Sequence, residues 1–348
     1  TGLTMTNKKF NKLFGKNPRN ENEEISKFHM DIASSIQTVL EEIILKISRS
    51  ISKEYGIKNL CLAGGVALNC VANGRILENK IFENIWIQPA SGDAGGALGA
   101  ALAFWYIQEK NTRTIDKDDS MNGSFLGPHY SDTEIKKELE KLGAHFEFLS
   151  YDDLITKTAD SLSKQKIMGW FQDRMEFGPR ALGNRSILAD PRPENMQEKI
   201  NLKIKFRENF RPFAPSILFK DVSNWFNLDI ESPYMLIVTK LLADKIINNK
   251  IKNKEPFGFE KLKIKRSMVD AITHVDYSAR VQTVNGKYNK KFYDLLTKFK
   301  QKTNCPLLVN TSFNVRGEPP VNTPKDAFNC FMSTNMDVLV IGNYFLKK

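Results

Sequence analysis

Arginine and glycine gather in one short stretch, residues 169–192, which holds four arginines and three glycines and shows neither helical nor strand periodicity. Such a stretch is typical of a functional loop. Glycine lets the backbone approach a ligand closely, and a guanidinium group can bind two oxygens of a phosphate or carboxylate at once. The alternative is a solvated arginine loop with ordinary turn glycines.

Two later stretches have the same character, residues 203–215 and residues 310–319, where lysine, arginine, proline or glycine interrupt the apolar pattern. Three such loops within one segment of the chain favour a shared pocket over three unrelated surface turns. We therefore expect one anion-binding pocket built from residues that are far apart in the sequence.

A strand, a double glycine and a helix are expected earlier in the chain. Residues 59–63 form a short apolar run that leads directly into Gly64 and Gly65, and the following helix passes through Asn69 and Arg75. The glycines would let a ligand lie against the backbone, and the N-terminus of the helix would offer free N–H groups to an anion. The pattern indicates nucleotide binding.

The next unit repeats this pattern, with a strand at residues 84–88, a loop containing Gly92 and Gly95, and a helix from Ala97 to Gln108. Two consecutive strand–helix units predict a parallel α/β sheet. Asp93 lies in the loop and could either cap the helix or bind a divalent metal ion. Neither loop fits a P-loop or a Rossmann fingerprint.

The remaining pattern predicts a long amphipathic helix at residues 23–53 that ends at Gly56, and a domain boundary in the polar segment 111–123. The second domain should be α+β. Its expected helices lie at residues 132–142, 152–164 and 290–302 and after Thr323, and its expected strands at 146–150, 166–171, 214–219, 234–239, 279–284, 306–309 and 337–341.

A net charge of +11 would suit a nucleic-acid partner. Residues 240–266 account for +6 of it, with nine Lys or Arg and three Asp or Glu. This lysine- and asparagine-rich composition indicates a solvated insertion rather than a nucleic-acid surface, so nucleic acid is not the expected partner.

Four scattered cysteines without a CxxC spacing predict buried, reduced thiols. No apolar run is long enough to span a bilayer, and the first residues show neither a signal-peptide core nor an initiator methionine. We expect a cytoplasmic protein without membrane partners, and a chain cut from something longer.

Six short motifs of this chain resemble those of the O-carbamoyltransferases of nodulation-factor and antibiotic biosynthesis, the NodU/CmcH type. The resemblance covers nearly the whole chain apart from the first ~20 residues and the lysine-rich insertion. It rests on six motifs in the family's order: residues 64–69, 91–101, 176–186, 210–215, His274-Val-Asp276 with Arg280, and 310–314.

The resemblance implies two domains. Residues 1–115 would be the second half of an actin-like (Kae1-like, ASKHA) domain that binds ATP and a metal ion, and residues 116–348 an α+β YrdC-like domain that binds carbamoyl phosphate. The implied reaction cleaves carbamoyl phosphate, activates the carbamoyl unit on ATP as carbamoyl-adenylate and transfers it to a hydroxyl of a sugar or secondary metabolite.

The resemblance also assigns residues by matching position. For carbamoyl phosphate it implies the cations and donors Arg180, Lys205, Arg211, Arg280, Asn310, Ser312 and Asn314, of which the four cations would also be catalytic. The nucleotide would lie at Gly64, Gly65, Asn69, Gly92 and Gly95. Asp93 would be a ligand of a divalent metal ion, either iron or magnesium.

The chain departs from the family in one respect. The family has a metal-binding HxxxH pair, whereas the four histidines here are residues 29, 129, 145 and 274. We therefore expect the C-terminal ~60% of such an enzyme, incomplete as a catalyst, which would act with the absent N-terminal half as a separate chain or as a homodimer.

Two other functions remain open. Enzymes that transfer threonylcarbamoyl groups to tRNA share both domain types, and tight, salt-sensitive tRNA binding would favour that alternative. The chain could also be a non-catalytic nucleotide-binding partner subunit.

Overall fold

The computed structural model describes residues 6–20, 22–115, 118–247 and 257–348. The residues fall into two units, the first ending at Ile43 and the second beginning at Ile44. The predicted domain boundary near residue 115 therefore stays a prediction.

The first unit contains α1 (Lys8–Phe14) and the beginning of α2 (Lys27–Tyr55). The side chain of Asn7 caps α1, and Gly15 ends it in the left-handed conformation. The long amphipathic helix is thus confirmed, starting four residues later than expected. Its apolar residues Ile36 and Val39 in this unit are about half exposed.

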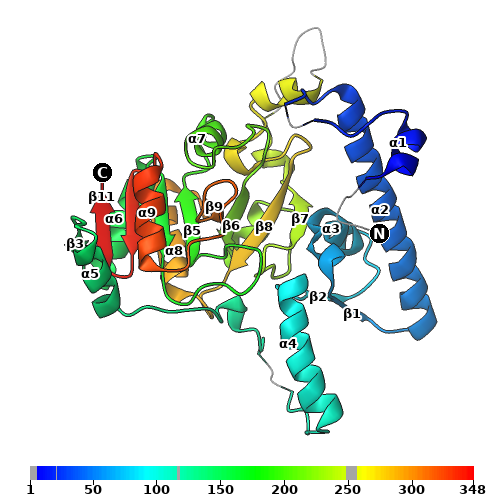
Figure 1. The fold of residues 1–348 in the computed structure, drawn as a ribbon, viewed down its shortest axis with the longest axis horizontal. Helices are drawn as coiled ribbons and strands as arrows, with labels where there is room; N and C mark the ends of the chain where they lie inside the picture. Colours follow the sequence, from blue (N-terminus) through cyan, green and yellow to red (C-terminus); the bar gives the residue numbers. More distant parts are fainter. Residues whose placement is uncertain (1–5, 21, 116–117, 248–256) are drawn as a thin grey trace. The chain divides into compact units, whose positions relative to one another are not determined.

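The second unit begins with the end of α2, where Ile47 and Ile51 are also exposed, and continues into two strand–helix segments (Figure 1). Their strands β1 (Asn59–Leu62) and β2 (Asn84–Ile87) pair in parallel, as predicted. Leu45 of α2, Ile76 of α3 (Cys70–Glu78) and Phe82 form a small core beneath them.

The two helices begin at places that differ from the prediction. After Gly64 the chain makes a short 3-10 turn (Gly65–Leu68), and α3 starts only at Cys70. The second helix, α4 (Asp93–Ala103), begins four residues early because Asp93 already adopts helical geometry, and it runs into a π-helical turn, Phe104–Gln108.

A mixed sheet of nine strands dominates the described part of the second unit (Figure 1). The strand order is β3-β11-β10-β4-β5-β9-β6-β8-β7, with β10–β4 and β6–β8 parallel and the other pairs antiparallel. The strands are β3 (Glu147–Phe148), β4 (Met168–Phe171), β5 (Arg185–Ala189), β6 (Ala214–Leu218), β7 (Ile237–Lys240), β8 (Ser278–Val284), β9 (Leu307–Ser312), β10 (Val338–Ile341) and β11 (Tyr344–Lys347).

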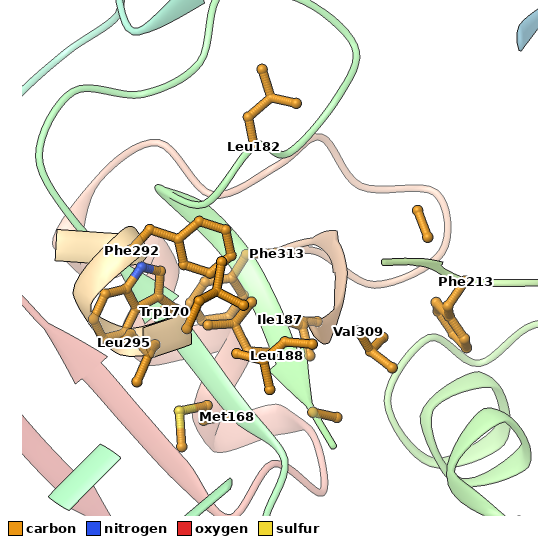
Figure 2. Close-up of a cluster of buried hydrophobic side chains, with 14 of the residues drawn as sticks. Met168, Trp170, Leu182, Ile187, Leu188, Phe213, Phe292, Leu295, Val309 and Phe313 are labelled. Carbon is orange, nitrogen blue, oxygen red and sulfur yellow. The ribbon is translucent and has the colours of Figure 1, made fainter. Parts of the chain in front are cut away.

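Among the described residues, five α-helices accompany this sheet: α5 (Asp132–Lys141), α6 (Tyr151–Ser163), α7 (Met196–Lys203), α8 (Lys290–Thr303) and α9 (Pro324–Ser333). Reciprocal side-chain caps begin α5 at Ser131 and α9 at Thr323. Trp170, Phe292 and Phe313 are buried together between the sheet and α8, as Figure 2 shows. This arrangement confirms a mixed α/β fold.

Several local predictions are wrong. Only residues 172–184 of the stretch 169–192 form a loop, because β4 and β5 occupy its ends. Strand β9 runs on to Ser312, which puts Asn310 in a strand. Tyr234 to Leu236 precede β7 rather than belonging to it. Helix α7 and strand β11 have no counterpart in the prediction.

The lysine-rich insertion at residues 240–266 lies partly outside the described residues. Its described flanks include buried residues, so they differ from the solvated segment that was predicted. Leu241 is buried, and Arg266 is buried with its guanidinium bonded to the carbonyls of Lys261 and Thr273. The prediction of four buried thiols is wrong for Cys61, which is exposed.

Among the described residues, no helix is both long enough and apolar enough to cross a membrane.

Helix α3 and strand β7 lie in close contact at Gly74. A Cβ added at Gly74 of α3 would overlap the carbonyl oxygen of Val238. We expect Gly74→Ala to destabilise the protein by about 1–3 kcal/mol, because overpacking outweighs the better helix propensity of alanine. Gly99→Ala in α4, where nothing lies within 4 Å of the added Cβ, is the matched control and should not destabilise. Denaturant unfolding of both variants checks this; equal stabilities would contradict it.

Candidate functional site

The loop at residues 172–184 is held from inside by a buried carboxylate. Oε1 of Glu176 accepts hydrogen bonds from the backbone N–H groups of Leu182, Asn184 and Arg185, at 2.7, 2.9 and 3.3 Å. The side chain of Gln282 on β8 donates to the carbonyl of Leu182 at 2.8 Å. The loop is therefore fixed over the sheet, although it has no secondary structure of its own.

Replacing Glu176 with glutamine should loosen this loop. The amide keeps the size of the side chain, but it loses the charge that strengthens the three hydrogen bonds. We expect a loss of about 1–3 kcal/mol in unfolding free energy, together with faster amide hydrogen exchange at Leu182 and Asn184. Glu318→Gln, at an exposed position, is the control. Unchanged exchange in Glu176→Gln would contradict the anchoring role.

Arg185 serves the structure rather than the pocket. Its side chain is only 1% exposed and donates to the carbonyls of Gln172, Asn184 and Pro128. Its guanidinium carbon lies 3.6 Å from the ring centroid of Phe171. Burial lowers the pKa of Arg185 to about 10.

Arg180, by contrast, extends from the loop toward the first strand–helix segment. Its guanidinium lies 3.4 Å from the carbonyl oxygen of Leu68 and 3.7 Å from Sγ of Cys70. Arg280 of β8 reaches the same thiol, and burial followed by the charge of Arg180 lowers the pKa of Arg280 to about 10. The Nε atoms of both arginines are buried and bond to none of the described residues.

Lys205 follows α7 and is only 3% exposed. Its Nζ donates to Oγ of Ser312 at 3.2 Å and to the carbonyl and Oδ1 of Asn314 at 3.0 and 2.6 Å. Burial, followed by the charge of Arg207, lowers the pKa of Lys205 to about 7. The lysine therefore joins the end of β9 to the segment that follows α7.

Arg207 and Arg211 complete the group. Arg207 donates to Oδ1 of Asn201 at 2.8 Å, and burial followed by the charge of Arg211 lowers its pKa to about 10. Arg280 contributes further to that lowering. Arg211 is exposed and pairs with Glu208 at 3.0 Å, so it lies at the rim. Arg207 was missed by the sequence reasoning, although it stands in the same motif.

These cations form one cluster, as the three loops predicted. We call it the cationic cluster and define it by Arg180, Lys205, Arg207, Arg211, Arg280, Ser312 and Asn314. Within the described ranges no carboxylate pairs with Arg180, Lys205, Arg207 or Arg280. Guanidinium groups without a carboxylate partner in a partly buried place favour a negatively charged ligand. The anion-binding pocket expected from the sequence stays a prediction.

Asn310 of β9 contacts the loop that carries Arg180 and the neighbouring strand β6. Its amide nitrogen donates to the carbonyl of Ala181 at 3.2 Å and to Oγ of Ser216 at 2.9 Å. Its buried position between β5 and β6 makes it part of the sheet interior.

The glycines expected to bind a nucleotide lie in the neighbouring segment. Gly64 adopts a left-handed φ of 96°, and nothing lies within 4 Å of a Cβ built at Gly65. Asn69 differs from the expectation, because its side chain caps α3 through the N–H of Ala72 at 3.1 Å. Gly92 precedes α4, and Gly95 packs tightly on the carbonyl of Ala90.

Asp93 does not cap α4, so the helix-cap alternative is wrong, whereas its role as a metal ligand stays a prediction. The N-cap position of α4 belongs to Gly92, and Asp93 is the exposed first residue of the helix. Over the part of the chain that the structure describes, no group of three or more His, Cys, Asp or Glu could hold a metal ion.

Residues 159–348 match the family model described as Carbamoyltransferase C-terminus, and residues 1–102 match the model described as Carbamoyltransferase N-terminus. An uncharacterized protein of Synechocystis is 53% identical, over 100% of this chain and 57% of its own length.

Two further relatives carry functional names. The nodulation protein NolNO of Sinorhizobium fredii is 40% identical over 92% of this chain and 44% of its own length. The 3'-hydroxymethylcephem-O-carbamoyltransferase of Streptomyces clavuligerus is 30% identical over 83% of this chain and 49% of its own length. The chain thus spans about half the length of these relatives. A solved structure of full-length HypF aligns with a TM-score of 0.35, too weak a likeness to carry an argument.

Proposed function

Because the chain belongs to the carbamoyltransferase family, we propose that it takes part in carbamoyl transfer and that the cationic cluster binds carbamoyl phosphate. The observation that carries this proposal is the pair Arg180 and Arg280, whose guanidinium groups lie together without a carboxylate partner among the described residues and with buried, unbonded Nε atoms. Two like charges in a partly buried place repel each other, and an anion bound between them would offset this repulsion.

Carbamoyl phosphate suits this place chemically. Its phosphate carries two negative charges, which match Arg180, Arg280 and the neighbouring Arg207 and Lys205. Its carbonyl oxygen and amide group can use neutral donors and acceptors, which the end of β9 supplies in Ser312 and Asn314. Arg211 at the rim would attract the ligand from solvent.

In the proposed reaction, the carbamoyl unit is activated on ATP as carbamoyl-adenylate and passes to a hydroxyl-bearing small molecule. The name of the Streptomyces relative as an O-carbamoyltransferase supports a hydroxyl acceptor. The turn at Gly64 and Gly65 would hold the nucleotide, and the contact of Arg180 with Leu68 brings that segment next to the cationic cluster. A metal ion would require ligands beyond Asp93, supplied by residues outside this chain or by a second copy of it.

The nucleotide proposal predicts the behaviour of Gly65→Ala. The added Cβ meets no protein atom within 4 Å, and Gly65 has no left-handed φ, so the variant should be as stable as the parent. The methyl group should nevertheless crowd a nucleotide lying on the backbone and weaken ATP binding by roughly tenfold or more. Thermal unfolding and ATP titration measure the two effects. Undiminished ATP binding would exclude the turn as the nucleotide site.

The proposal as a whole is tested by calorimetric titration of the chain with carbamoyl phosphate. We expect binding that weakens as salt concentration rises, because charge–charge attraction dominates. Sulfate should compete, and acetamide, which lacks the phosphate, should not. Absence of carbamoyl phosphate binding would contradict the proposed function.

A further inference from the structure

One cavity is lined by residues of α3, α7 and β7 and of the turn at residues 274–278. Its volume is about 300 Å³, at the lower end of small-molecule sites. Apolar side chains, among them Val71, Phe210 and Val238, form much of its wall. A polar group of His274, Asp276 and Ser278 also lines it, together with Gln197 and Thr273.

This polar group is a fixed chain of hydrogen bonds. Oγ of Ser278 donates to Oδ1 of Asp276 at 2.6 Å and lies 3.2 Å from Nδ1 of His274. Since the single hydroxyl hydrogen of the serine goes to the carboxylate, Oγ must accept from Nδ1–H of the histidine. Lys240 holds Asp276 in place through a bond to Oδ2 at 2.7 Å.

The second ring nitrogen of His274, Nε2, is left without a proton. With the proton on Nδ1, Nε2 of His274 carries a free lone pair, and no described residue forms a hydrogen bond to it. Burial lowers the pKa of His274 to about 4, so the imidazole is neutral at physiological pH. A neutral histidine with an oriented ring and an open nitrogen can accept a proton. A pKa of about 4 makes it a weak base in the free protein, and the negative charge of a phosphate bound nearby would raise that pKa.

The position of the cavity joins this histidine to the cationic cluster. Phe210 and Pro212, which line the cavity, stand on either side of Arg211. Ser278 and Arg280 are two residues apart on β8, so their side chains leave the strand on the same face. The charge of Arg280 also acts on His274.

We propose that His274 is the general base that activates the water molecule that cleaves carbamoyl phosphate. This inference rests on the proposed function and adds a catalytic residue to it. Nε2 takes a proton from water while the water oxygen forms a bond to the carbamoyl carbon. The bond from that carbon to the bridging oxygen breaks, and the electron pair leaves with phosphate. The proton then passes from Nε2 to the phosphate, so the products are carbamic acid and inorganic phosphate. The carbamic acid loses its remaining O–H proton to solvent and becomes carbamate.

The test compares phosphate release with binding in His274→Gln. The turn at residues 274–278 is closed by backbone bonds, from the N–H of His274 to Ser278 and from the N–H of Tyr277 to His274, so the variant should fold. Phosphate release from carbamoyl phosphate is measured with and without ATP, after subtraction of the uncatalysed breakdown. We expect a fall of roughly 100-fold or more, with a carbamoyl phosphate affinity within about threefold of the parent.

Two further variants and a nitrogen-15 spectrum test whether His274 acts as a base in the expected tautomer. Phosphate release by Ser278→Ala should be roughly tenfold slower than in the parent. This variant lacks the hydrogen bond that fixes the tautomer of His274 but keeps the histidine itself. The exposed His145→Gln should lose nothing. Nitrogen-15 spectra should show His274 as the Nδ1–H tautomer at neutral pH. Undiminished phosphate release in His274→Gln, or an Nε2–H tautomer in the parent, would overturn the inference, whereas loss of carbamoyl phosphate binding by the parent would instead contradict the proposed function.

Discussion

Arg280→Ala is expected to weaken carbamoyl phosphate binding by about 2–5 kcal/mol, or roughly 30- to 5,000-fold. Arg280 lies on β8, is largely buried, and shares its surroundings with Arg180 rather than with a carboxylate. A ligand phosphate would therefore be its main counter-charge. Removing the guanidinium leaves a partly desolvated anion with fewer donors, and the energetic penalty of such a loss is large.

The fold should survive this change. Alanine removes a repulsion between two guanidinium groups in the free protein, so unfolding free energy should stay constant or rise. Arg174→Ala is the matched control: Arg174 lies in the same loop as Arg180, is exposed, and donates to the carbonyl of Gly127. Titration calorimetry of both variants gives the answer. Equal affinities for Arg280→Ala and Arg174→Ala would remove Arg280 from the site.

Gly183→Ala is expected to cause the largest loss of stability, about 3–5 kcal/mol from overpacking and backbone strain together. Gly183 has a φ of 113°, which side chains rarely adopt, and its Cβ would overlap the ring of Phe292. That ring is fully buried beside Trp170, as Figure 2 shows, and cannot move aside. The carbonyl of Gly183 also accepts from Nε1 of Trp170 at 2.8 Å.

A second glycine separates the two causes. Gly317 also has a left-handed φ, 82°, but nothing lies within 4 Å of its added Cβ. Gly317→Ala should therefore show strain alone, about 1–2 kcal/mol. Denaturant unfolding compares the two variants. A loss in Gly183→Ala no greater than in Gly317→Ala would mean that the packing on Phe292 is not rigid.

The sequence predicted elements well where local signals were strong. The helix expected after Thr323 and the amphipathic helix expected at residues 290–302 lie where α9 and α8 form. It failed where tertiary contacts decide. Strand β5 follows the glycine-rich loop directly and is buried on both faces, so its residues show no alternation. Strand β11 forms because it pairs with β10 across a tight turn.

The candidate site shows the same division. Composition alone indicated that three arginine-bearing loops would meet, and the contacts of Lys205 with Ser312 and Asn314 agree. Composition could not separate cations that face a ligand from those that hold the fold. Arg185 and Arg180 stand in one motif, yet one binds backbone carbonyls in the interior and the other faces a second buried arginine. That difference depends on the carbonyls that the folded loop presents.

The proposed pocket is tested most directly by a crystal structure of the chain with carbamoyl phosphate bound. We expect the phosphate group between Arg180 and Arg280, within hydrogen-bonding distance of the Nε atoms that are now buried without a partner, and the carbamoyl group toward Ser312. Carbamoyl phosphate bound elsewhere in the chain, with Arg180 and Arg280 making no contact to it, would contradict the proposed function.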